Sequence, residues 1–183
     1  MRTSTLAVLV LMASIAVPAA LALDEGTPAS AGDQQFFEQH ANDIVKIKAD
    51  ALENPALGKV LTGKFFSLNI TIGGGGEKVV AARMGDKAIP IALPDTDADM
   101  PDFAKLVKPG FTLKTDADAH ALQDAFDVLY PVDKDDASVK TIRHSGNTWT
   151  FIRAKFFDHF DGLIVTTDGS GKITDVKRSL EVK

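Results

Sequence analysis

The sequence predicts an α+β fold, in which two helices pack on an antiparallel β-sheet in the order α-βββ-α-ββββ. Apolar residues recur at helical spacing in residues 34–53 and again in residues 115–130. Between and after these stretches, apolar and polar residues alternate as in strands with one buried face. The connections between the predicted strands are short and rich in Gly, Asp and Asn, which favours hairpins and excludes parallel crossovers.

The first 22 residues are predicted to be an export signal. Arg2 gives them a positive start, and the apolar run over residues 6–20 is too short to cross a hydrocarbon core of ~30 Å. Small residues at positions 20 and 22 predict cleavage after Ala22, with a membrane anchor as the alternative. Residues 23–32 are then predicted to be a flexible leader, and residues 33–183 a single α+β domain.

The composition restricts the chemistry of the chain. Its 183 residues include no cysteine, which excludes disulfides, a thiol nucleophile, cysteine-type zinc sites and a lipid anchor on cysteine. The formal net charge is −5 without a cluster of Lys and Arg, so we expect no nucleic-acid partner. No later apolar run approaches the ~20 residues of a membrane-spanning helix, so we expect a periplasmic or secreted protein.

The first predicted helix runs from Gln34 to Glu53, with Gly32-Asp33 at its start and Asn54-Pro55 at its end. Its apolar face consists of Phe37, Ala41, Ile44, Ile47 and Ala51. Three strands are predicted to follow, at residues 59–72, 77–84 and 87–93. Four glycines at 73–76 are expected to form a loop, because their backbone entropy opposes regular structure. Pro90 has no N–H to donate, which places the third strand at a sheet edge.

The second half begins with a predicted loop over residues 94–110 that contains one helical turn at 103–107, followed by a short strand at 111–114. Thr115 is predicted to cap a second helix that ends at Tyr130-Pro131. The buried stripe of this helix is Ala119, Leu122, Phe126 and Leu129. Four strands complete the sheet, at residues 139–144, 148–157, 163–167 and 172–182.

Two finer interpretations of this fold stay open. A cone-shaped domain of the cystatin-like or nuclear-transport-factor-like kind is one architecture that fits, although no motif indicates membership of either family. A duplicated helix-plus-hairpin unit is the other, because ten residues separate Gly73 from Arg83 and Asp168 from Arg178 after similar Lys-Phe-Phe segments. Hairpins also acquire similar turns independently, so this spacing alone does not decide between them.

Two acidic segments are candidate metal sites. The first contains four aspartates with calcium-loop spacing: Asp95, Asp97, Asp99 and Asp102. Met100 and Leu106 stand where an EF-hand needs Gly and a bidentate Glu, which favours a solvated loop. The second contains Asp116, Asp118 and His120, and the two aspartates are better explained by capping of the helix that begins after Thr115. We therefore predict neither a metal nor a cofactor.

One segment has the composition of a proton-transfer site. His159 is flanked by Asp158 and, two residues on, by Asp161, and a carboxylate beside a histidine can orient the ring and raise its basicity. Successive residues of a strand face opposite sides, so these groups converge only if the backbone bends, which Gly162 permits. The wet end of a strand is the alternative interpretation, and no catalytic residue is predicted.

The strand predicted at residues 148–157 is the main candidate binding site. Alternation places Trp149, Phe151, Arg153 and Lys155 on one face. If that face points away from the helices, its aromatic rings and cations are typical of a binding surface. In the alternative, Trp149 and Phe151 belong to the core and the cations lie at the sheet edge.

These observations favour an exported, non-enzymatic domain that uses an exposed sheet face to bind a protein, a peptide or an envelope component. The alternative is a small-ligand-binding or enzymatic α+β domain with an enclosed pocket, at whose mouth Asp158, His159 or His144 supplies polar groups. Fold class alone does not decide between these two functions.

Overall fold

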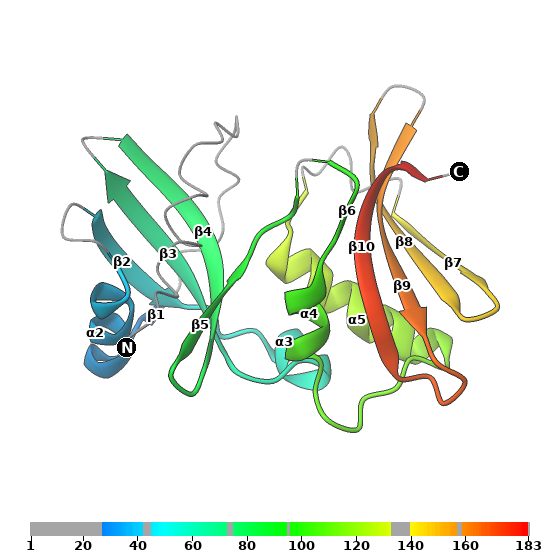
Figure 1. Cartoon of the computed structure of the whole chain (residues 1–183), viewed down its shortest axis with the longest axis horizontal. Coiled ribbons are helices and arrows are strands. Elements are labelled where there is room, and N and C mark those ends of the chain that lie inside the picture. Colours follow the sequence, from blue (N-terminus) through cyan, green and yellow to red (C-terminus); the bar gives the residue numbers. More distant parts are fainter. Residues whose placement is uncertain are drawn as a thin grey trace, which may run out of the picture. The chain divides into compact units, whose positions relative to one another are not determined.

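The fold is α+β, with four described helices and two five-stranded antiparallel sheets (Figure 1). This computed structural model describes residues 27–41, 45–72, 75–94, 96–132, 140–156 and 159–182. The chain divides into two compact units, which we call unit 1 (Met1–Glu53 with Gly63–Ile91) and unit 2 (Asn54–Thr62 with Ala92–Lys183). The sequence instead predicts two helices on one antiparallel sheet. In the part of the chain that the structure describes, no helix is long and apolar enough to cross a membrane.

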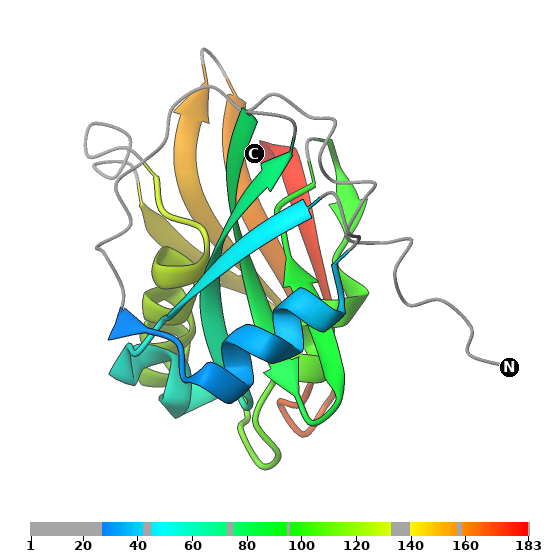
Figure 2. The same ribbon diagram turned by 90° about the vertical axis from the view of Figure 1, so that its left-hand side faces the viewer.

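Unit 1 consists of helix α2 (Ala31–Gln39) and a sheet in the order β1-β2-β3-β4-β5. The strands are β1 (Thr27–Pro28), β2 (Val45–Ala51), β3 (Lys64–Ile72), β4 (Gly75–Met84) and β5 (Lys87–Ile91). Helix α2 lies across one face of this sheet (Figure 2). β1 and the start of α2 fall in the stretch that the sequence predicts to be a flexible leader.

The helix predicted over residues 34–53 is wrong in its second half, which forms strand β2. Within β2, Ile47 and Ala49 are buried while Lys46 and Lys48 are exposed, which is the alternation of a strand. The apolar residues of α2 and those of β2 happen to continue the same spacing of three and four residues, although they belong to two separate elements. Asn54-Pro55 does not end a helix but starts α3 (Pro55–Val60), where the Asn54 side chain accepts a hydrogen bond from the N–H of Ala56.

Helix α2 begins after Ser30, three residues before the predicted cap. The Ser30 hydroxyl accepts a hydrogen bond from the N–H of Asp33 and donates one to its carboxylate at 2.7 Å. The Gln34 carboxamide then ties the helix to β2, since it donates to the carbonyl of Ile47 and accepts from the N–H of Ala49. These bonds fix the position of α2 along β2, where the phenylalanine side chains of the helix pack on the sheet.

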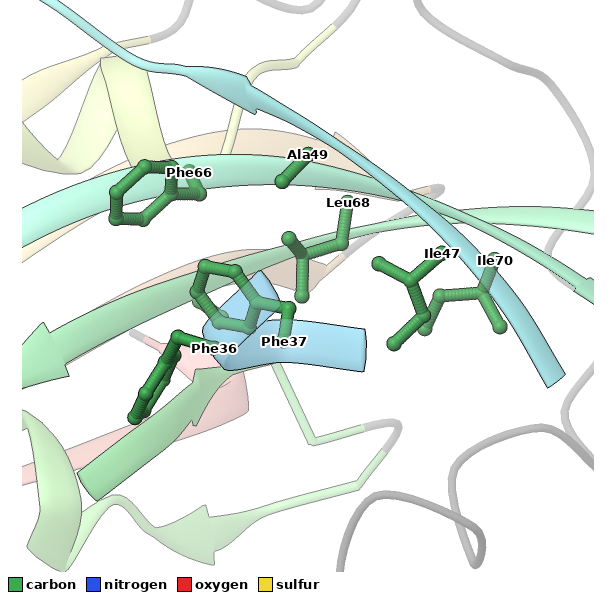
Figure 3. Packing of buried hydrophobic residues seen from close by; sticks show 8 residues of the cluster. Phe36, Phe37, Ile47, Ala49, Phe66, Leu68 and Ile70 are labelled. Atoms are coloured by element: carbon green, nitrogen blue, oxygen red, sulfur yellow. The ribbon is translucent and has the colours of Figure 1, made fainter. Parts of the chain in front are cut away.

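The core of unit 1 is built around Phe37, which is fully buried. Its ring meets Phe66 of β3 edge to face at 5.0 Å, and the side chain of Leu68 points towards Phe37 (Figure 3). The burial of Phe66, Leu68 and Ile70 confirms the alternation predicted for this strand. The other face of β3 is not uniformly wet as predicted, because Ser67 is also buried.

The remaining strands of unit 1 follow the prediction with one change. Gly75 and Gly76 belong to β4 and pair with Ile72 and Thr71, although a loop is predicted there; Gly73 and Gly74 lie outside the described residues. The strand that contains Pro90 ends the sheet, which confirms its predicted place at an edge.

Unit 2 contains α3, α4 (Pro101–Leu106) and α5 (Asp116–Leu129), and a sheet in the order β6-β10-β9-β8-β7. Its strands are β6 (Ala98–Asp99), β7 (Thr141–Ser145), β8 (Thr148–Phe156), β9 (His159–Thr167) and β10 (Ile173–Val182). Residues 111–114 form no strand, although one is predicted there. The Leu113 N–H donates to the carbonyl of Gly171.

Helix α5 confirms its prediction closely. Thr115 is the N-cap, and it forms a reciprocal capping box with Asp118. The four residues of the predicted stripe are all buried: Ala119, Leu122, Phe126 and Leu129. Phe126 packs edge to face against Phe151 of β8 at 5.2 Å and lies 5.0 Å from Phe103 of α4, so the helices cover the Phe151 face of the sheet.

Gly162 lies where the sheet of unit 2 is irregular. The register between β8 and β9 shifts between Ile152 and Ala154, opposite Gly162, so the extra residue of the bulge is Arg153 on the strand beside Gly162. A Cβ atom on Gly162 would lie 2.8 Å from Val182 Cγ2 and 3.1 Å from the carbonyl oxygen of Phe151. The close approach of these atoms therefore requires glycine.

Gly162→Ala is expected to lower the free energy of unfolding by about 1–3 kcal/mol, since the added methyl overpacks a closed site. Urea denaturation measures this change, and Gly58→Ala is the matched control. A Cβ on Gly58 in helix α3 would have open space around it, so that change is expected to be neutral or to stabilise by up to about 1 kcal/mol. The cost of Gly162→Ala should shrink in a Val182→Ala background; equal costs in both backgrounds would contradict the proposed clash.

Candidate functional site

The predicted binding strand lies in the interior of unit 2. Trp149, Phe151 and Arg153 are only 2%, 1% and 5% exposed. Phe151 packs against α5, and the imidazole of His144 stacks on the indole of Trp149 at 3.8 Å with an angle of 10° between the rings. The prediction that this face points outwards is therefore wrong. The alternative is confirmed for Trp149 and Phe151, which lie in the core, but not for Arg153, which is buried on an inner strand of the sheet instead of lying at its edge. The side chain of Lys155 lies outside the described residues.

Alternation separates the two faces of β8 but does not say which one meets the helices. Ile152 and Ala154 are buried as well, so hydrophobicity does not distinguish the two sets of side chains. The bulge at Arg153 also breaks the strict alternation on which the prediction depends. No signal in the sequence reveals a bulge at this position except Gly162 on the opposing strand.

Arg153 takes part in a buried ion cluster, which we define as Arg153, Asp161 and Arg178. Arg153 Nη1 lies 3.0 Å from Asp161 Oδ2, and Arg178 Nε lies 2.9 Å from Asp161 Oδ1. Arg178 Nη2 adds a second bond to Asp161 Oδ2 at 3.1 Å, which makes the Arg178 contact bidentate. The side chains of Arg153 and Asp161 are 5% and 3% exposed, so this contact is largely shielded from water.

The ion cluster also holds two backbone segments. Arg153 donates from Nη2 to the carbonyl of Tyr130 at the end of α5, and Arg178 donates from Nη1 to the carbonyl of Pro94. Burial lowers the pKa of Arg153, and the carboxylate of Asp161 opposes that shift. Burial raises the pKa of the Tyr130 hydroxyl. The cluster thus joins three strands to the end of a helix and to the loop before β6.

The ion cluster has the chemistry of a structural site. Both oxygens of Asp161 already accept hydrogen bonds from guanidinium groups, which leaves this carboxylate a poor base and a poor nucleophile. Within the described residues Arg153 Nε has no hydrogen-bond partner. Nothing in this geometry positions a group for proton transfer.

Unit 1 contains a similar arrangement around Asp33, which we call the Asp33 cluster. Its carboxylate lies 2.7 Å from Arg83 Nη1 and 3.0 Å from Lys64 Nζ, and the Arg83 guanidinium stacks over Phe36 at 4.2 Å. Burial alone would raise the pKa of Asp33, but hydrogen bonds from Ser30, Lys64 and Arg83 outweigh it and hold that pKa below its ordinary value. Sequence reasoning missed both clusters, because their members lie far apart along the chain.

Two aspartates of the first candidate metal segment contact other groups of the protein. Asp97 accepts hydrogen bonds from the N–H of Leu180 and from the Ser179 hydroxyl, and Asp102 pairs with Lys105 at 2.7 Å. Asp95 lies outside the described residues. Among those that are described, no group of three or more His, Cys, Asp or Glu side chains could hold a metal ion.

The segment at residues 115–120 acts as the predicted cap. The Asp118 carboxylate accepts hydrogen bonds from the N–H groups of Lys114 and Thr115. Burial would raise the pKa of Asp118, but hydrogen bonds from Thr115 and from these backbone groups lower it overall. His120 bonds through Nδ1 to the carbonyl of Asp116, one turn earlier in the same helix.

The proton-transfer candidate cannot be assembled from what the structure describes. Asp158 and the side chain of His159 lie outside that part of the chain. Asp161 belongs to the ion cluster. His144 is exposed, and its Nε2 lies 2.8 Å from the carbonyl oxygen of Gly146 while its ring covers Trp149. These contacts give His144 a packing role.

The face of the unit 2 sheet opposite Trp149 is the accessible one, and we call it the outer face. Cross-strand pairing places Arg143, Thr150 and Ile164 in one row, and Ser145, Thr148 and Thr166 in the next. These six side chains are exposed or partly exposed. These two rows of the outer face are therefore rich in hydroxyl groups and only slightly apolar, and they lack the aromatic residues that sequence reasoning placed on this face.

Comparison of the chain with protein-family models, with curated proteins and with solved structures finds no match. Trp149, Phe151 and Arg153 belong to the interior of unit 2, whereas the outer face is exposed or partly exposed.

Asp161→Asn is expected to lower the free energy of unfolding by about 3–5 kcal/mol, because it leaves the buried guanidinium group of Arg153 and the partly buried one of Arg178 without their anion. Asp102→Asn is the control, since it breaks an exposed ion pair worth about 0–1 kcal/mol. Chemical denaturation monitored by Trp149 fluorescence measures both changes. Equal, small losses in the two variants would show that the ion cluster is not structural.

The Asp33 cluster predicts a pH-dependent difference between wild type and Asp33→Asn. A lowered pKa in the folded state means that the carboxylate stabilises the fold above its ordinary unfolded value of 3.8, and that this contribution is lost as the pH falls through the folded-state pKa. Unfolding free energies measured from pH 7 to pH 3 should therefore differ between the two proteins at neutral pH and converge in acid. If the difference in unfolding free energy stayed constant or grew below pH 3.8, the lowered pKa of Asp33 in the folded state would be contradicted.

Proposed function

We propose that this protein is an exported, non-enzymatic binding protein and that a partner protein or peptide contacts the outer face of the unit 2 sheet. Export is supported by the amino-terminal pattern described above, and a periplasmic or secreted location follows from it. The choice of this face is supported by its exposure and by the packing of the helices. Phe103 of α4 and Phe126 of α5 meet on the opposite side of the sheet, the side of Phe151.

The chemistry of the outer face suits a protein partner. Threonine and serine side chains are short and lose little rotamer freedom on binding, and their hydroxyl groups donate and accept hydrogen bonds. Ile164 lies in the same cross-strand row as Arg143 and Thr150, and its side chain adds partly exposed apolar area to that row. A small apolar centre surrounded by polar groups resembles the general composition of protein interfaces.

The enzymatic or small-ligand alternative has weaker support. It depends on Asp158, His159 and His144, of which only the last has a described side chain, and that side chain is engaged with Trp149 and Gly146. Of the three buried aspartates among the described residues, Asp33 and Asp161 are each held by two cations, and Asp50 lies 3.5 Å from Lys48 and accepts a hydrogen bond from Asn69. We therefore favour binding over catalysis.

The finer fold interpretations also remain proposals. A helix followed by four strands occurs in each unit, as α2 with β2–β5 and as α5 with β7–β10, and this supports an internal duplication. The two hairpins compared in the sequence are β3–β4 and β9–β10. They do not correspond, because β3–β4 are the second and third of the four strands that follow α2 in unit 1, whereas β9–β10 are the third and fourth of those that follow α5 in unit 2. A cystatin-like relationship is supported only by the general arrangement of a helix across an antiparallel sheet.

Ile164→Lys is expected to reduce capture of the partner from a cell-envelope extract by about tenfold, equivalent to about 1.4 kcal/mol. The bait is the chain from residue 23 to residue 183, and quantitative mass spectrometry compares the captured proteins. Gln35→Lys makes the same change of charge on the exposed side of α2 and serves as the control. If both variants captured the same proteins as the wild type, the outer face would not be the binding surface.

A further inference from the structure

We propose that the free edge of β7 binds an extended segment of a partner polypeptide, which adds to the unit 2 sheet as a further strand. This inference deepens the proposed function and rests on it, because it names the partner's conformation and the groups that recognise it. Figure 1 shows β7 at the margin of this sheet, beside β8.

Three of the four sheet edges in the described structure are poor templates for another strand. β1 and β6 each contain two residues, and β1 includes Pro28. β5 carries Pro90, which cannot donate a hydrogen bond. Short length and proline are the usual means by which proteins protect an edge from strand addition. β7 differs from all three, because it has five residues and no proline.

The backbone of β7 presents two pairs of groups to this edge. A two-residue turn at Gly146-Asn147 joins β7 to β8, and the flanking residues Ser145 and Thr148 are cross-strand partners. In such a hairpin the residues next to the turn form the hydrogen-bonded pair, and the pattern then alternates along the strand. The N–H and C=O groups of Ile142 and His144 therefore point away from β8. No described strand pairs with them.

An extended peptide is the occupant that satisfies this edge. The outward N–H and C=O groups of Ile142 and those of His144 lie two residues apart, or roughly 6.8 Å, which equals the spacing of hydrogen-bonding groups along the edge of a second strand. Exposed Thr141 and Ser145 offer short side chains that leave room for a neighbouring strand. A second copy of β7 fits less well, because the antiparallel register with full overlap would set Arg143 opposite its own copy.

The sharpest test compares Ile142→Pro with Ile142→Ala. Both variants lose most of the Ile142 side chain, but only proline removes the outward N–H, and neither change removes an inner N–H of the β7–β8 ladder. The probe is a peptide selected on the residue 23–183 chain from a displayed random library of about twelve residues, a length that covers an added strand. Fluorescence anisotropy then gives its affinity for each protein.

The wild type and Ile142→Ala are expected to bind the selected peptide within about twofold of each other, and Ile142→Pro at least about tenfold more weakly. Near-ultraviolet circular dichroism of Trp149 shows whether each variant is folded. Should the proline variant fail to fold, amide exchange of the wild type decides the matter. The amides of Ile142 and His144 should then exchange fast in the free protein and slowly with the peptide bound.

Other results would overturn this inference. Equal binding to all three proteins, unprotected amides at Ile142 and His144, or no selected peptide would each exclude the edge as a peptide site. A wild-type dimer in light scattering that Ile142→Pro dissociates would assign the edge to a second copy instead. Loss of binding in Ile164→Lys but not in Ile142→Pro would retain the proposed function of the outer face while rejecting the edge. Failure of the envelope capture would reject that function separately.

Discussion

The contact between Asp161 and its two arginines is the interaction on which the structure of unit 2 depends. It lies beside the bulge of β8, and its three members come from β8, β9 and β10, so it fixes the register of three neighbouring strands at their least regular point. Through Arg153 and Arg178 it also holds the end of α5 and the loop at Pro94. A charge buried this deeply is tolerated only when it is paired and hydrogen bonded, so each member depends on the others.

Unit 1 uses the same principle with a different arrangement. Asp33 comes from a helix, and its cations Lys64 and Arg83 face each other across β3 and β4. The carboxylate neutralises two like charges that would otherwise repel each other as cross-strand neighbours. It thereby attaches α2 to the sheet beneath it. In unit 2 the aspartate that the sequence analysis considered for proton transfer, Asp161, is instead part of the framework. What remains available for function is the surface, above all the outer face and free edge of the unit 2 sheet.

Local signals in the sequence predicted several elements well. Helix α5 was predictable because its cap, its acidic first turn and its apolar stripe all indicate the same element. The edge position of β5 followed from Pro90, whereas the bulge lies on the strand beside Gly162 and not at Gly162 itself. The first predicted helix failed because α2 and β2 together mimic one helical period, and nothing local marks the change at residues 42–44. The candidate site failed for a different reason: burial of both faces of β8 hides which of them meets the helices.

The sequence by itself determined the α+β class, the periods and caps of its clearest elements, the lack of cysteine chemistry and the position of one sheet edge. These properties depend on neighbouring residues, which interact regardless of how the rest of the chain folds. Only the tertiary structure decided that the strands form two sheets, that Trp149 and Phe151 point inwards, and that Asp33 and Asp161 each collect two cations. Those outcomes depend on pairings between residues far apart in the sequence, such as Asp33 with Arg83 and Ala98 with Arg178. No local pattern encodes such a pairing, because its energy exists only once the strands and helices have come together.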